Sequence, residues 1–182
     1  MNHTLETLEA EANRPEAPAV HEDARDVQLA HFLPYQLSIA SNAVSALIAE
    51  RYRSRFGLKV TEWRVMAVLG DAVADQEGVT QRDFTEISLM DKVAVNRACK
   101  VLDQRGLIAR APNSSDGRSH LMVLTDEGRA VHREVLPLAL ETESEMLSGF
   151  SAAEQRSLRA MLERLRRKAE HVARTPVCAQ PN

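Results

Sequence analysis

The feature that most constrains the fold of this chain is a change of hydrophobic period near its middle. Three short stretches with helical spacing begin at Thr61, Thr80 and Asp91, and two short alternating stretches follow at residues 107–111 and 120–124. The polar segment between the alternating stretches contains Asp-Gly, a pair that favours a tight turn. Three helices followed by a β-hairpin predict a winged helix-turn-helix lobe.

Longer helical patterns, with apolar residues in steps of three and four, bracket this lobe. We expect the lobe to cover residues 58–124 and the flanking helices, 30–57 and 125–173, to form a helical dimerisation region. Residues 1–29 read as a flexible acidic arm and 174–182 as a flexible tail. The expected fold class is mainly α with a small β-hairpin wing.

Local signals refine the helices of the lobe. Thr61 is an expected N-cap, and Thr80 with Asp83 resembles a capping box in which Asp replaces the usual Glu or Gln. Phe84 and Ile87 are expected on the buried side of the helix that follows.

The charge of the chain is distributed unevenly. The formal net charge is −3, and residues 1–30 hold seven acids and two bases, whereas residues 80–120 hold seven bases and five acids. A local basic segment can bind phosphate whatever the total charge. A solvated helix face is the alternative that charge alone leaves open.

Other compositional features exclude several classes of protein. No apolar run approaches the ~18 residues of a membrane span, and no secretory signal is visible at the N-terminus. Cys99 and Cys178 fit neither a disulfide nor a metal-site spacing. We therefore expect a cytoplasmic protein without a cofactor or metal and without a membrane partner.

The helix that Asp91 begins is the strongest candidate for binding DNA. Its expected buried side comprises Ala94, Val95, Ala98, Cys99 and Leu102. Lys92, Asn96 and Lys100 are spaced i, i+4, i+8 and share the opposite face, with Arg97 beside them. Lys and Arg bind phosphates or guanine, and Asn pairs with adenine in the major groove. The backbone N–H groups at the start of this helix are expected to add donors for a phosphate.

The hairpin loop adds Arg118, which can enter a minor groove, and Asp116, which can orient it by a charge-assisted hydrogen bond. For either residue alone, a solvated turn is the alternative. The DNA-binding candidates are Thr80, Gln81, Lys92, Ala94, Asn96, Arg97, Lys100, Asp116 and Arg118.

Residues 32–172 resemble the multiple-antibiotic-resistance-regulator (MarR) family. The resemblance lies in Leu58-Lys-Val-Thr-Glu-Trp-Arg-Val-Met-Ala-Val-Leu69, Met90-Asp-Lys-Val-Ala-Val-Asn-Arg97, Val101-Leu-Asp-Gln-Arg-Gly-Leu-Ile-Ala-Arg110, Asp116-Gly-Arg-Ser119 and Val123-Leu-Thr-Asp-Glu-Gly128. It implies a homodimer held by the first, fifth and sixth helices and a ligand-responsive repressor of a neighbouring operon. The dimer would bind a pseudo-palindromic operator with half-sites about 10 bp apart. Gly117 departs from the family, which often has a second Arg there.

The resemblance also implies an effector, because family members often bind an aromatic acid or its CoA thioester in a cleft between the dimer helices and the DNA-binding lobe. The ligand-binding candidates are His31, Tyr35, Ser38, Asn42, Trp63 and Arg64. Trp63 is equally a candidate for the core, and the polar residues for solvated or interface positions.

Three other functions are alternatives to this one. No HExxH, GxSxG, Walker or dinucleotide-binding pattern is present, so an enzyme is not expected. A redox-responsive repressor would use Cys99, although a small buried hydrophobe is the commoner role on that side of the helix. A winged helix that binds protein would tolerate loss of the basic face.

Overall fold

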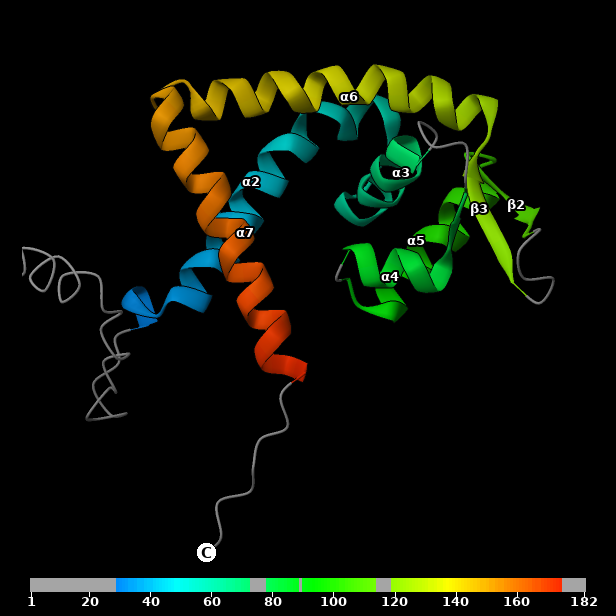
Figure 1. The fold of residues 1–182 in the computed structure, drawn as a ribbon. Coiled ribbons are helices and arrows are strands. Elements are labelled where there is room, and N and C mark those ends of the chain that lie inside the picture. The colour runs from blue at the N-terminus through cyan, green and yellow to red at the C-terminus, as the bar shows by residue number, and fades with distance from the viewer. Residues whose placement is uncertain (1–28, 73–77, 89, 114–118, 175–182) are drawn as a thin grey trace, which may run out of the picture. The chain divides into compact units, whose positions relative to one another are not determined.

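The computed structural model describes residues 29–72, 78–88, 90–113 and 119–174. The chain divides into two compact units, Met1–Ala43 and Val44–Asn182, which are described separately below. Figure 1 shows the elements in chain order. They are η1 (Leu29–His31), α2 (Leu33–Phe56), α3 (Val60–Ala72), β1 (Val79–Thr80), α4 (Gln81–Ser88), α5 (Lys92–Gln104), β2 (Ile108–Pro112), β3 (His120–Leu124), α6 (Asp126–Leu147) and α7 (Ala152–Arg174).

The first unit holds η1 and the beginning of α2. The side chain of Gln36 donates a hydrogen bond to the carbonyl oxygen of Ala30 at 2.6 Å, which ties the short 3-10 helix to the first turn of α2. Leu33 and Ile39 are about half exposed within the monomer.

The start of α3 differs from the sequence-based expectation. Gly57 ends α2 with φ +62°, as predicted, but α3 begins at Val60, so Thr61 lies inside the helix and the N-cap prediction is wrong. The carboxylate of Glu62 accepts a hydrogen bond from the backbone N–H of Lys59 at 2.9 Å. Glu62 is only 3% exposed, and its carboxylate satisfies a donor at the helix start from the buried side.

The predicted hairpin is present, but it belongs to a three-stranded antiparallel sheet in the order β1-β3-β2. In β2 and β3, Ile108 pairs with Leu124 and Pro112 with His120, whereas β1 pairs Val79 with Met122. Strand β1 was not predicted, because two residues are too few to display an alternating pattern. Strand β2 also begins one residue later than expected.

The core of the second unit lies where α3, α4, α5 and the sheet meet. Phe84 and Leu102 are fully buried, as are Met66 and Val95. Ile87, predicted to share the buried side of α4 with Phe84, is 63% exposed, so that prediction is wrong. Helix α4 has eight residues, and Phe84 is the one whose side chain is buried.

Helices α6 and α7 both begin at residues whose side chains cap the helix. The Thr125 hydroxyl accepts from the N–H of Gly128 at 3.0 Å. At the start of α7, Ser151 and Glu154 form the complete capping box, and these hydrogen bonds lower the pKa of the Glu154 carboxyl. No described helix is long and apolar enough to cross a membrane.

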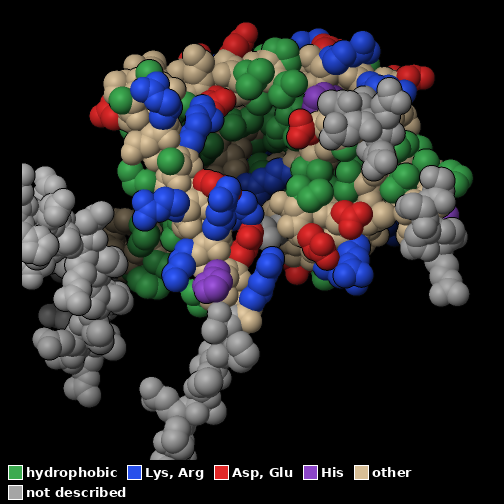
Figure 2. Space-filling view, in the orientation of Figure 1, with side chains coloured by type: hydrophobic (Ala, Val, Ile, Leu, Met, Phe, Trp, Pro, Cys, Tyr) green, Lys and Arg blue, Asp and Glu red, His purple; other side chains and the backbone are tan. Residues whose placement is uncertain are grey.

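Helix α7 carries both charged and apolar surface and has no buried residue. Lys and Arg side chains with Glu between them lie along its visible face (Figure 2). On this helix, hydrogen bonds from Arg166 and Arg167 lower the pKa of Glu163 to about 2. Elsewhere on α7 lies an exposed apolar stripe of Leu158, Met161, Leu162 and Leu165.

Candidate nucleic-acid interface

Helix α5 separates its apolar and polar side chains as the sequence predicts. Its buried residues are Val95, Ala98, Cys99 and Leu102, while Ala94 is half-buried. Its exposed residues include Lys92, Asn96, Arg97 and Lys100. The packing of one side against α3 and α4 therefore presents this polar face to solvent.

The N-terminus of α5 is capped by its own chain. The Asp91 carboxylate accepts from the backbone N–H groups of Val93 at 2.9 Å and Ala94 at 3.1 Å. Two of the donors that we expected to be available to a phosphate are therefore already occupied. Fewer backbone donors are therefore available to a phosphate at this end than we expected.

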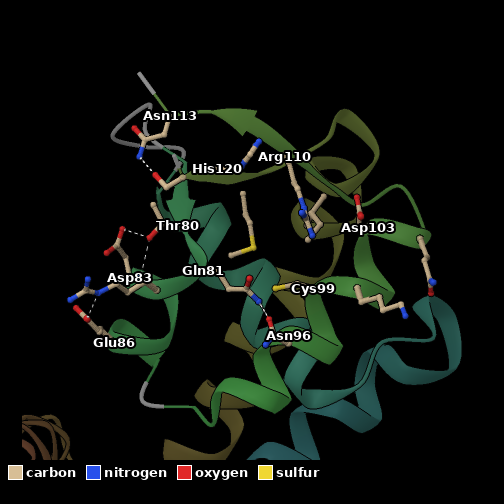
Figure 3. A pocket seen from close by; sticks show the side chains of 16 residues that line it. Thr80, Gln81, Asp83, Glu86, Asn96, Cys99, Asp103, Arg110, Asn113 and His120 are labelled. Carbon is tan, nitrogen blue, oxygen red and sulfur yellow. Dashed lines mark hydrogen bonds and ion pairs between the residues drawn. The ribbon is translucent and has the colours of Figure 1, made fainter. Parts of the chain in front are cut away.

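Thr80 and Gln81 lie at the junction of β1 and α4. The Thr80 hydroxyl accepts from the N–H of Asp83 at 3.1 Å, which confirms the first half of the predicted capping box. The Asp83 carboxylate accepts from the Thr80 hydroxyl at 2.7 Å rather than from the Thr80 backbone N–H. The Gln81 amide donates a hydrogen bond to the side-chain oxygen of Asn96 (Figure 3). This contact orients Asn96 and leaves its NH₂ group free to donate to a base edge.

A groove of about 1020 Å³ lies between α4, α5 and the β2–β3 hairpin. Asn96 and Lys100 line it from α5, and Arg110 and His120 line it from the strands (Figure 3). Cys99 and the apolar side chains of Ile108 and Met122 also line it. The groove is thus continuous with the exposed polar face of α5.

The C-terminal end of α5 is fixed to the end of α2. The Arg105 guanidinium donates to the carbonyl oxygens of Phe56 at 2.6 Å and Gly57 at 3.3 Å, and lies 3.9 Å from the Glu62 carboxylate. Arg105 belongs to the basic segment seen in the sequence, but its guanidinium is used to hold helices together.

A second set of contacts ties the same end of α5 to α6. The Thr125 hydroxyl donates to the carbonyl oxygen of Gly106 at 2.6 Å, and the Thr125 N–H donates to that of Leu107 at 3.2 Å. Gly106 follows the helix with φ +67°, a left-handed conformation that glycine commonly adopts at this position. The end of α5 therefore cannot shift without disturbing both α2 and α6.

Cys99 is a buried thiol. It is 8% exposed, and burial raises the pKa of its thiol, although the nearby Arg110 guanidinium offsets part of this effect. Reactive cysteines are usually accessible thiolates with a lowered pKa. The structure therefore favours the packing role of Cys99 over the redox role.

The ligand-binding candidates fall into both units. His31, Tyr35, Ser38 and Asn42 are exposed residues of the first unit. In the second unit, Trp63 is 8% exposed and its ring centroid lies 5.4 Å from that of His132 and 5.8 Å from that of Tyr52. Trp63 therefore belongs to the core, the alternative that the sequence offers to a ligand-binding role.

Arg64, the remaining ligand-binding candidate, is exposed and donates to the Ser45 hydroxyl at 2.9 Å. The two wing candidates, Asp116 and Arg118, lie outside the described residues.

Sequence analysis missed two features of the interface. The sequence places Arg110 within the basic segment but indicates no separate role for it or for His120. Period-two alternation along β2 and β3 places Ile108, Arg110, His120 and Met122 on the groove, so the strand pattern held this signal.

Comparison with known proteins agrees with this geometry. The family model described as "MarR family" matches residues 56–119. The HTH-type transcriptional regulator PecS of Dickeya dadantii is 30% identical over 62% of this chain and 67% of that relative. The transcriptional regulator HosA of Escherichia coli is 30% identical over 46% of this chain, and the match spans 62% of the length of HosA.

Solved structures extend the similarity beyond the lobe. The crystal structure of a MarR/EmrR family transcriptional regulator from Acinetobacter sp. ADP1 is 27% identical, with a TM-score of 0.72, over 80% of this chain and 99% of that one. The winged helix and the flanking helices are therefore both shared with this structure.

Proposed function

The chain belongs to the MarR family of transcriptional regulators, and from this premise we propose that it is a homodimeric repressor. In this proposal α5 binds the major groove of a pseudo-palindromic operator, and a small aromatic acid or its CoA thioester releases the protein from DNA. The proposed DNA-binding residues remain those inferred from the sequence, including Asp116 and Arg118.

The exposed face of α5 is the observation that carries the proposal. Lys92, Arg97 and Lys100 have no ion-pair partner among the described residues, whereas Arg51, Arg55 and others outside this face are paired with acids. Unpaired cations on one helix face are available to phosphates and guanines.

A structural neighbour supports DNA as the partner. The MarR family regulator from Listeria monocytogenes, 20% identical with a TM-score of 0.63 over 73% of this chain and 85% of that one, was solved with 26mer DNA. That complex concerns the neighbour, and its fold is the one shared here.

Fluorescence anisotropy with the promoter region beside the protein's own gene tests this proposal, over a salt series and against an unrelated duplex. We expect selective, strongly salt-dependent binding. Arg97→Ala should weaken it by about 5- to 150-fold, which corresponds to the 1–3 kcal/mol of a base contact. Arg118→Ala should also weaken it.

Arg156→Ala, an exposed position on α7, is the matched control and should leave affinity unchanged. Binding that is unselective, or indifferent to Arg97→Ala and Arg118→Ala, would contradict the proposal and favour a protein-interaction module.

The apolar stripe of α7 supports a homodimer, because Leu158, Met161, Leu162 and Leu165 are 38–58% exposed within the monomer. Sedimentation equilibrium should therefore show a dimer, and Leu162→Glu should dissociate it. Ala160→Glu introduces the same charge on the opposite side of α7 and should leave the dimer intact. A monomeric wild type would contradict this part of the proposal.

The effector is proposed on two grounds. CouR from Rhodococcus jostii RHA1, 24% identical with a TM-score of 0.65 over 76% of this chain and 94% of that one, was solved with p-coumaroyl-CoA. In this chain the ligand-binding candidates Tyr35 and Arg64 offer an exposed aromatic ring and an exposed guanidinium, which suit a carboxylate-bearing ring.

Adding p-coumarate or p-coumaroyl-CoA to the preformed operator complex tests this part. We expect release, at higher effector concentration for Tyr35→Ala and Arg64→Ala than for wild type. Trp63 is not used, because replacing a core residue would confound the measurement. No release by either compound, or release unaffected by both variants, would contradict the assignment.

A further inference from the structure

We propose that one sugar-phosphate strand of the bound duplex crosses the groove between α5 and the β2–β3 hairpin, and that Arg110 holds a phosphate of that strand. This inference rests on the proposed function, because it requires α5 to lie in a major groove. It adds a DNA contact from β2, a strand that contributes none of the DNA-binding candidates inferred from the sequence.

The path of the strand follows from the geometry of a duplex. The major and minor grooves are separated everywhere by a sugar-phosphate strand. If α5 lies in the major groove and the hairpin reaches the adjacent minor groove, the strand between them must pass between α5 and the hairpin. The described residues place a groove of about 1020 Å³ at that position (Figure 3).

Arg110 is available to a phosphate. It lines the groove, its side chain is exposed, and its guanidinium has no hydrogen-bond or ion-pair partner within the described part of the chain. Lys100 lines the groove from α5 and is likewise exposed. A strand crossing at this level would therefore meet one cation from the helix and one from the sheet.

The acidic side chains that line the groove limit where a phosphate strand can bind within it. Asp83 is engaged by Thr80, and Glu86 is paired with Arg82 at 3.2 Å. Asp103 lies one turn beyond Lys100, near the end of α5, and has no side-chain partner among the described residues. Asp103 lines the same groove as Arg110, so its negative charge would repel a phosphate held by Arg110 and reduce its binding.

Two substitutions with opposite expected effects test the inference by anisotropy, using the promoter duplex and an unrelated duplex. Arg110→Ala should weaken binding to both duplexes by the same factor, on the order of 10-fold for each lost contact, because a phosphate carries no sequence information. The slope of log K against log salt should become shallower by about 1.8, since a dimer loses two phosphate contacts. Asp103→Asn should strengthen binding to both duplexes.

Arg110→Lys should preserve most of the slope, because the charge remains, and Arg156→Ala should match wild type. Thermal melting of each variant checks folding, and because Arg110 and Asp103 are exposed we expect wild-type melting.

The outcomes separate this inference from the proposed function. If wild type binds the promoter duplex selectively and Arg110→Ala has the same affinity and slope, only the inference is overturned. Loss confined to the promoter duplex would also overturn it, because that result indicates a base contact. If wild type binds no duplex, the inference fails together with the proposed function.

Discussion

Replacing Gly128 with alanine tests how closely α6 approaches the end of the DNA-binding helix. A Cβ at Gly128 would lie 1.9 Å from the carbonyl oxygen of Leu107, although contacts below 3.0 Å are essentially never observed. The obstructing atom is backbone, so it cannot rotate away. The start of α6 and residue 107 must therefore separate by about 1.1 Å, which follows from these two distances.

The energetic cost can be worked from this displacement. Forcing extra volume into a packed site costs about 1–3 kcal/mol. The same shift would stretch the hydrogen bond from Thr125 N–H to Leu107, already 3.2 Å long, at a further cost of about 1 kcal/mol. Alanine recovers up to about 1 kcal/mol through its higher helix propensity. We expect a net loss of about 1–3 kcal/mol.

Thermal denaturation at fixed protein concentration measures this loss. At about 2–4 °C per kcal/mol for a chain of this size, the melting temperature should fall by roughly 2–12 °C. Gly149→Ala is the matched control, because nothing lies within 4 Å of its Cβ position, and it should change stability by less than about 1 kcal/mol. If Gly128→Ala melts at or above the temperature of Gly149→Ala, the close approach is refuted.

Three further predictions concern single side chains. Gln81→Ala should reduce operator selectivity with little effect on binding to an unrelated duplex, because Gln81 orients Asn96; equal losses on both duplexes in anisotropy would contradict this role. Burial lowers the pKa of His132, and Asp71 offsets part of this effect. Below the ordinary imidazole pKa of about 6.5, His132 takes up a proton in the unfolded chain more readily than in the folded protein. The melting temperature should therefore fall as the pH drops below that value, and His132→Gln should flatten this dependence; an equal dependence in both proteins would show that His132 is not its source. Because burial raises its thiol pKa, Cys99 should react slowly with a thiol reagent in a Cys178→Ser background and rapidly after denaturation; rapid reaction of the native protein would restore the redox hypothesis.

The features that sequence analysis missed depend on tertiary contacts, and local sequence patterns do not reveal such contacts. Glu62 is buried beside Arg105, whose guanidinium lies 3.9 Å from the Glu62 carboxylate. The two residues are 43 positions apart in the chain, so no local pattern links them. Trp63 belongs to the core because His132 on α6 stacks against it. Strand β1 exists because Val79 pairs with Met122.

The features that can be predicted from the sequence are those that depend on neighbours a few positions away. Asp91 begins α5, Gly106 follows its end, and the buried and exposed sides of α5 lie where the helical period places them. The family was likewise recognisable from short motifs. The groove that contains Arg110 forms because tertiary packing brings α5 beside the hairpin. Local periodicity cannot predict it, because packing between distant segments determines which exposed residues come together.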